Sequence, residues 1–253
     1  MSDLIVIARD ETSYACDVVS GLCSFGKPPS IVFVGSGAQR ILFKLSSLRR
    51  IWRQLGPLEA MKRIQRSKEQ PSVRSGRSSP SIDSLSRNYG FEVEKYDIIN
   101  QGSMIVRILT AKQPITVLAG CGIVDKALID ASSGRCLNGH PAWLPGLRGV
   151  DVFEWSILKD VPFGVTAHLV DEKVDAGKII LRRRLVPVGE KNFWTFSERL
   201  RKAQADVLVR AAIMMHAGKA ESIENSEANS ELCLAMPDRL HAQARRKFQT
   251  KLA

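Results

Sequence analysis

The chain has 253 residues, 44% of them hydrophobic, and a formal net charge of +11. This length and composition fit one large α/β domain with appendages, and the apolar runs fall short of the roughly 20 residues that a membrane-spanning helix needs. The opening MSDLIVIARDETS lacks a basic start, so we expect a first strand there and not a signal peptide. The five cysteines form no CxxC or Cys/His pattern, which predicts reduced thiols, no metal centre and a cytoplasmic location.

Short β-branched runs bounded by polar residues, Gly or Pro predict buried strands. In chain order they are residues 4–8, 31–34, 91–93, 115–120, 135–137, 164–170 and 178–186. Apolar residues at three- and four-residue spacing predict helices between them. These are residues 14–22, 45–66 with an interruption at 56–57, 101–111, 125–131, 150–159 and 193–217. The alternation predicts an α/β fold with a Rossmann-like, mostly parallel sheet flanked by helices, the last two strands forming a hairpin.

Two segments fall outside this alternation. Residues 67–87 are rich in Ser, Arg, Pro and Gly, so we expect a mobile loop there. Beyond Gly218 a polar stretch leads to a basic, helix-like end whose start Asp238 could cap. We therefore expect one domain over residues 1–218 and a short C-terminal extension over 219–253.

The positive charge is concentrated in residues 44–87, which hold eleven Lys or Arg against three Asp or Glu. We call this segment the basic insert. It could contact nucleic acid, an anionic membrane surface or a phosphorylated metabolite, or be a solvated helix face. Its only aromatic residue is Trp52, so it lacks the interleaved aromatic side chains of single-strand binders, and nucleic acid is the less favoured partner. The amphipathic residues 45–64 suit a membrane surface better.

The stretch CLNGHPAWLPGLRG, residues 136–149, places an Asn and a His two residues apart at the end of an apolar run. Its prolines and glycines would break a helix and stop a strand, so we expect a rigid loop from Asn138 onward. In α/β folds, loops at strand ends commonly carry the functional site. Two further segments follow predicted strands in the same way, the glycine-rich residues 119–124 and the polar residues 168–177.

Asn138, His140 and Asp175 are the candidate catalytic residues. A His exchanges a proton near neutral pH, an Asp beside it fixes the ring tautomer, and an Asn amide can donate to an oxygen that gains negative charge. Since no Ser or Cys nucleophile accompanies them in the sequence pattern, the trio suits direct acyl transfer between two bound substrates. Taken singly, each has a simpler interpretation as a loop histidine or a turn residue. Only their combination favours a site.

The segment NGHPAWLPGLRG followed by FGVTAHLVDEKVDAGKII resembles the paired signature of folate-dependent formyltransferases. The resemblance is strong from about Gln113 to Ile180 and weaker, in strand order, from Leu4 to about Gly218. In that family the two loops meet around the formyl group of 10-formyltetrahydrofolate. Members act on glycinamide ribonucleotide, methionyl-tRNA or nucleotide-linked amino sugars. The resemblance therefore implies an enzyme with 10-formyltetrahydrofolate as formyl donor and with no metal.

By the same resemblance, Asn138 would hold the formyl oxygen, His140 would take the proton of the attacking amine, and Asp175 would orient His140. The pterin ring would lie against the backbone of two loops, with Thr166 and His168 as structural supports. The lining residues would be Gly122, Ile123, Val124, Val170, Asp171 and Glu172. Where the family usually has Gly-Pro before the last strand, this chain has Gly-Lys, so that loop is less constrained.

The resemblance leaves the amine acceptor open. The first strand is followed by ARDETS, which has two acids and no glycine and so lacks the phosphate loop of glycinamide ribonucleotide enzymes. The 35 residues after Gly218 are fewer than the second, basic barrel domain of methionyl-tRNA enzymes needs. We therefore expect a nucleotide-linked amino sugar of polysaccharide biosynthesis, whose pyrophosphate the basic insert or Arg148 could contact.

Two alternatives stay open. The acceptor could be another amine, such as glycinamide ribonucleotide, an amino acid or an aminoacyl-tRNA. The chain could also be a non-catalytic member of the family that binds an anionic surface through its basic insert. A homodimer is compatible with either.

Overall fold

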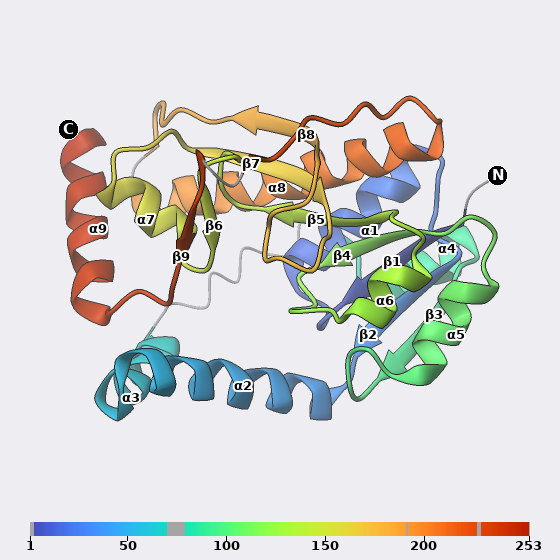
Figure 1. Ribbon diagram of the computed structural model, residues 1–253, viewed down its shortest axis with the longest axis horizontal. Helices are drawn as coiled ribbons and strands as arrows, with labels where there is room; N and C mark the ends of the chain where they lie inside the picture. The colour runs from blue at the N-terminus through green and yellow to red at the C-terminus, as the bar shows by residue number, and fades with distance from the viewer. Residues whose placement is uncertain (1–2, 70–78, 191, 227–228, 253) are drawn as a thin grey trace.

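The computed structural model describes residues 3–69, 79–190, 192–226 and 229–252. A seven-stranded sheet forms its centre, in the order β3-β2-β1-β4-β5-β7-β8 (Figure 1). The strands are β1 (Leu4–Ala8), β2 (Ile31–Gly35), β3 (Glu92–Tyr96), β4 (Ile115–Ala119), β5 (Cys136–His140), β7 (Gly164–Leu169) and β8 (Ile179–Arg184). The first five are parallel, whereas β7 is antiparallel to both β5 and β8. The predicted α/β fold with a mostly parallel, Rossmann-like sheet is confirmed.

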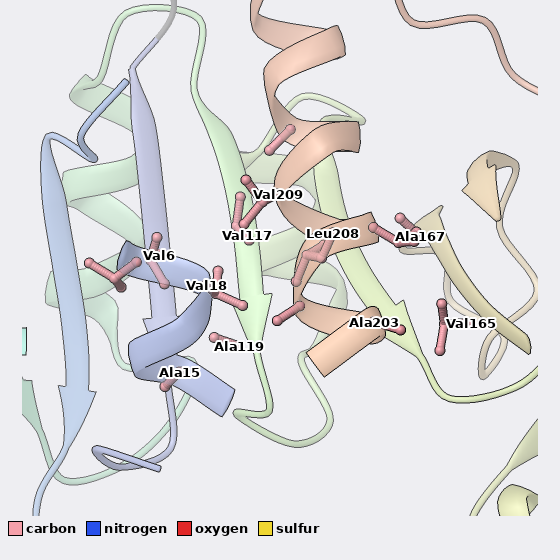
Figure 2. Packing of buried hydrophobic residues seen from close by; sticks show 14 of the residues in the cluster. Val6, Ala15, Val18, Val117, Ala119, Val165, Ala167, Ala203, Leu208 and Val209 are labelled. Carbon is pink, nitrogen blue, oxygen red and sulfur yellow. The ribbon is translucent and has the colours of Figure 1, made fainter. Parts of the chain in front are cut away.

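Helices cover both faces of the sheet. One face carries α1 (Ser13–Ser24), α4 (Ile82–Tyr89) and α8 (Phe193–His216), and the other carries α5 (Gly102–Thr110) and α6 (Lys126–Ala131). Strand side chains alternate between the two layers, as in β1, where Val6 joins the first hydrophobic cluster and Ile7 the second. Figure 2 shows the first cluster, in which Val117 of β4 lies between the helices that carry Val18 and Val209.

Residues 44–69 of the basic insert belong to two helices, α2 (Gly37–Leu55) and α3 (Pro57–Glu69), which lie along one edge of the molecule (Figure 1). They are held by the C-terminal segment. The side-chain oxygen of Gln54 accepts the Ala235 N–H at 3.2 Å, and Glu59 accepts the Asp238 N–H at 2.8 Å. Ile51 and Ala60 bury their side chains against Ala235. Helices α2 and α3 and the C-terminal segment therefore pack as one unit.

The C-terminal segment also pairs with the sheet side of the molecule. Its strand β9 (Glu231–Cys233) runs parallel to β6 (Leu147–Gly149), and its helix α9 (Asp238–Leu252) packs beside α7 (Val152–Leu158). Asp151, just before α7, accepts the Met236 N–H at 3.0 Å and forms an ion pair with Arg63 of α3 at 3.0 Å. The helical end was predicted from the sequence, but the β6–β9 pair was not.

Three local predictions are wrong. Strand β5 does not stop at Asn138 but continues to His140, because Asn138 pairs with His168 and His140 with Thr166 on the antiparallel neighbour β7. The helix predicted from residue 45 begins at Gly37, where the Ser36 hydroxyl caps the Ala38 N–H.

The third concerns the mobile loop predicted over 67–87. Helix α3 extends to Glu69, and α4 begins at Ile82 under a cap from Ser81, so the ends of this segment are helical. Buried Ile82 and Leu85 attach α4 to the core, an apolar contribution that the surrounding polar composition obscured. Residues 70–78 lie outside the described part of the structure, and the prediction is untested there. In the described ranges, none of the helices has the length and hydropathy needed to cross a bilayer.

Candidate active site

Strand β5 and its neighbour β7 bring polar side chains together near the carboxyl ends of the parallel strands. Asn138 and His140 are two residues apart in β5 and so project to the same side of the sheet. Antiparallel pairing places His168 opposite Asn138. The rings of His140 and His168 lie edge to face, with centroids 6.3 Å apart. Both histidines are buried, with exposed fractions of 3% and 2%.

Asp175, in the loop between β7 and β8, faces these groups. One carboxylate oxygen, Oδ2, accepts the Gly149 N–H at 3.0 Å and lies 3.4 Å from Nδ1 of His140. The other, Oδ1, lies 3.4 Å from both Nε2 of His168 and the amide nitrogen of Asn138. The backbone of Asp175 is left-handed, with φ of 50°. A residue other than glycine adopts this conformation at a cost, so the surrounding contacts must stabilise the loop.

Two features supply that support, one from outside the loop and one within it. Asn225, in the C-terminal segment, is buried and donates to the backbone carbonyls of Asp175 at 2.9 Å and Gly177 at 3.2 Å. Gly177 packs so closely that an added Cβ would lie 2.0 Å from the Leu169 carbonyl oxygen. The close approach requires glycine, and the loop position of Asp175 follows from it.

The charge state of the pair follows from burial and neighbours. Burial raises the pKa of Asp175, but His140, His168 and the Gly149 N–H together outweigh it, so the pKa lies well below the usual aspartate range. Burial also lowers the pKa of His140, and the Asp175 carboxylate only partly offsets this. Asp175 is therefore ionised and His140 neutral near pH 7.

Hydrogen bonding fixes the tautomer of neutral His140. Its Nε2 lies 2.8 Å from the Leu147 carbonyl oxygen, which can only accept, so Nε2 carries the hydrogen. Nδ1 then carries no hydrogen, and its lone pair faces the Asp175 carboxylate. A proton delivered there would be held between the Nδ1 and Oδ2 atoms, so the arrangement is suited to proton uptake.

A cavity of about 100 Å³ opens beside these groups. Asn138, His168 and Asp175 form one wall, and the loops after β4 and β7 form the rest. The cavity is lined by all six residues expected to contact the pterin: Gly122, Ile123, Val124, Val170, Asp171 and Glu172. His140 is not among its lining residues and lies behind Asp175. The sequence resemblance therefore selected residues that do surround a single cavity.

A larger groove of about 760 Å³ adjoins this cavity and shares four lining residues with it, Gly122, Ile123, Val174 and Asp175. Its far wall is the inward face of α2, and its rim includes residues 232–234 of the C-terminal segment. The two hollows meet at Asp175. This arrangement could hold two substrates whose reactive groups meet at the carboxylate.

Sequence reasoning missed part of this site. His168 was expected to be only a support, yet it lines the cavity and contacts Asp175. Asn225 lies in a polar stretch with no pattern to mark it. Arg148, expected as an anion contact, donates to the Val174 carbonyl at 3.2 Å. Across the described ranges, no three His, Cys, Asp or Glu side chains are grouped to hold a metal ion.

A family model described as formyl transferase matches residues 91–212, which include every candidate residue except Asn225 and those of α2. These residues belong to the formyl transferase family. The family segment therefore extends from β3 into α8 and contains both loops of the cavity.

Curated relatives agree with this assignment. Methionyl-tRNA formyltransferase of Syntrophus aciditrophicus (strain SB) is 28% identical over 197 residues, 76% of this chain and 60% of the relative. The same enzyme of Geobacillus sp. (strain WCH70) is 30% identical over 165 residues, 62% of this chain and 52% of the relative. The chain thus spans only about half to three-fifths of the length of these relatives.

Solved structures show a similar fold. The formyltransferase PseJ from Anoxybacillus kamchatkensis, in complex with UDP-4,6-dideoxy-4-formamido-L-AltNAc and tetrahydrofolate, is 25% identical with a TM-score of 0.50, covering 61% of this chain and 82% of that one. An N-formyltransferase from Helicobacter canadensis is 14% identical with a TM-score of 0.59, and the match covers 92% of this chain and 71% of that one. Phosphoribosylglycinamide formyltransferase from Streptococcus pneumoniae is 19% identical with a TM-score of 0.56, and the match covers 85% of this chain and 99% of that one. The last two show the fold alone.

Proposed function

We propose that this protein transfers the formyl group of 10-formyltetrahydrofolate to the primary amine of a small acceptor. The observation that carries the proposal is the meeting of two hollows at Asp175, one lined by the expected pterin contacts and the other open toward α2. Membership of the matched segment in the formyl transferase family supports it. So does the tetrahydrofolate bound to PseJ.

In this mechanism, the backbone of residues 122–124 and 170–172 holds the pterin ring and directs the formyl carbon toward Asn138. The two amide contacts of Asn138, to Asp175 and His168, are long at 3.4 and 3.5 Å, so a formyl oxygen can compete for an N–H donor. That donor stabilises the negative charge that develops on the oxygen as the amine attacks.

Proton transfer completes the reaction. The amine nitrogen forms a bond to the formyl carbon and loses a proton, and the bond from that carbon to N10 of the folate breaks as N10 gains one. Ionised Asp175 lies at the junction of the hollows, with Nδ1 of neutral His140 directly behind it. The two groups share the proton taken from the amine and return it to the leaving nitrogen.

The acceptor that we propose is a nucleotide-linked amino sugar. The groove of about 760 Å³ is of the size that drug-sized ligands occupy, and one of its walls is a basic helix. The structure of PseJ contains a UDP-linked formamido sugar, and the part that resembles this chain is 82% of PseJ.

An aminoacyl-tRNA is the second candidate, because the curated relatives are methionyl-tRNA formyltransferases and the insert is basic. Turnover separates the two. The first candidate predicts loss of 10-formyltetrahydrofolate with nucleotide-linked 4-amino sugars, and the second predicts it only with charged tRNA.

Calorimetric binding of 5-formyltetrahydrofolate, a stable analogue of the donor, tests the folate site. We expect micromolar binding by the native protein, with weaker binding after Asp171→Ala or Asn138→Ala. Absence of binding at high concentration would refute the proposed function. If anionic vesicles bound instead, the non-catalytic alternative would replace it.

A further inference from the structure

Three arginines lie close together on α2 and line a hollow at the surface. Arg49, Arg50 and Arg53 line a hollow of about 320 Å³ together with Ser46 and Gln54. Among the described residues, no ion pair or hydrogen bond involves any of the three guanidinium groups. Three unneutralised positive charges so close together repel one another, and an anion between them would remove that repulsion.

Arg50 differs from its neighbours because it is only partly exposed. Its Nε atom is buried and has no hydrogen-bond partner within the described ranges. A guanidinium group stays charged in proteins, so a buried donor of this kind lowers stability unless a ligand accepts from it. A ligand that enters the hollow could accept from this donor.

The hollow is continuous with the candidate active site. Ser46, Arg50 and Gln54 are spaced four residues apart on one face of α2, and all three also line the large groove that reaches Asp175. Gln54 is oriented by the C-terminal segment, since its Oε1 accepts the Ala235 N–H at 3.2 Å. Its amide N–H groups are then left as donors.

We propose that Arg50, assisted by Arg49, Arg53 and the Gln54 amide, binds the diphosphate of a nucleoside-diphosphate acceptor while its amine reaches Asp175. The inference rests on the proposed function and deepens it by naming the residues that select the acceptor class. The planar guanidinium fork matches phosphate oxygens in a bidentate geometry that a lysine cannot reproduce.

Calorimetry with UDP and with inorganic pyrophosphate as probes tests this subsite in the full chain. The variants are Arg50→Gln, which removes the charge, and Arg50→Lys, which keeps the charge but lacks the fork. Arg40→Ala is the matched control, because Arg40 is an exposed arginine of the same helix that lines neither hollow. Binding of 5-formyltetrahydrofolate is measured for each variant in parallel, as a check on folding and on the folate site.

We expect Arg50→Gln to weaken UDP binding by about 10- to 100-fold, the loss that corresponds to one or two charge-assisted hydrogen bonds. Arg50→Lys should weaken it by a smaller factor and Arg40→Ala by less than about twofold. Weaker binding of pyrophosphate than of UDP would show that the nucleoside contributes. A native protein that binds the folate analogue but neither probe, or equal losses in Arg50→Gln and Arg40→Ala, would overturn the subsite and leave the proposed reaction standing. Failure of folate binding in the native protein would instead count against the proposed reaction.

Discussion

Asn225→Ala should loosen the Asp175 loop although residue 225 is far from it in the sequence. The buried amide of Asn225 donates to the backbone carbonyls of Asp175 and Gly177, at 2.9 and 3.2 Å. Alanine leaves both carbonyls without this donor. Two lost hydrogen bonds in a buried setting correspond to about 2–3 kcal/mol. For a chain of this size, that loss lowers the melting temperature by roughly 4–12 °C.

The assay is a thermal melt followed by calorimetry with 5-formyltetrahydrofolate. The pterin contacts 170–172 lie in the same loop, so we also expect folate affinity to fall. Ser226→Ala is the matched control, since its side chain is exposed in the same segment. If Asn225→Ala melts and binds as the Ser226→Ala control does, the C-terminal segment does not hold the loop and the reasoning is refuted.

Three further predictions concern the same site. His140→Ala and Asp175→Ala should each lower turnover by about 10²-fold or more, and a near-normal rate in either would remove that residue from the mechanism. Gly177→Ala should lower both the melting temperature and folate affinity, because its Cβ would lie 2.0 Å from the Leu169 carbonyl oxygen, and an unchanged protein would contradict the packing. Burial holds the pKa of His140 below its value in the unfolded chain. Below about pH 6.5 the unfolded chain therefore binds a proton that the folded chain does not, and the free energy of unfolding falls by up to about 1.4 kcal/mol per pH unit. Denaturant unfolding at pH 7.5 and 5.0 should show a weaker pH dependence for His140→Gln than for the native protein, and equal slopes would refute this.

The sheet could be predicted because its strands are short β-branched runs between turn residues. The path of β5 could not, since its last residues are polar and followed by proline. The antiparallel neighbour β7 carries that strand through Asn138 to His140, and a non-local pairing of this kind leaves no mark in either segment. The same holds for the β6–β9 pair, whose strands are 3 residues each.

The candidate site was predicted to a different degree. Its loop residues could be named because they belong to a sequence signature, and they do line one cavity. The position of His168 opposite Asn138 follows from cross-strand register, and its contact with Asp175 from the path of the loop after β7; both depend on the fold. The support from Asn225 depends on how the C-terminal segment packs, so a single side chain in a polar stretch gave no signal.

The central claim is formyl transfer at Asp175, and turnover of 10-formyltetrahydrofolate with a nucleotide-linked 4-amino sugar tests it most directly. The account predicts that the native protein releases tetrahydrofolate and a formylated sugar, and that Asp175→Asn, which keeps the side-chain shape but removes the charge, does so at least about 10²-fold more slowly. Equal rates for the native protein and Asp175→Asn, or a native protein that binds the folate analogue but formylates no amine, would contradict it.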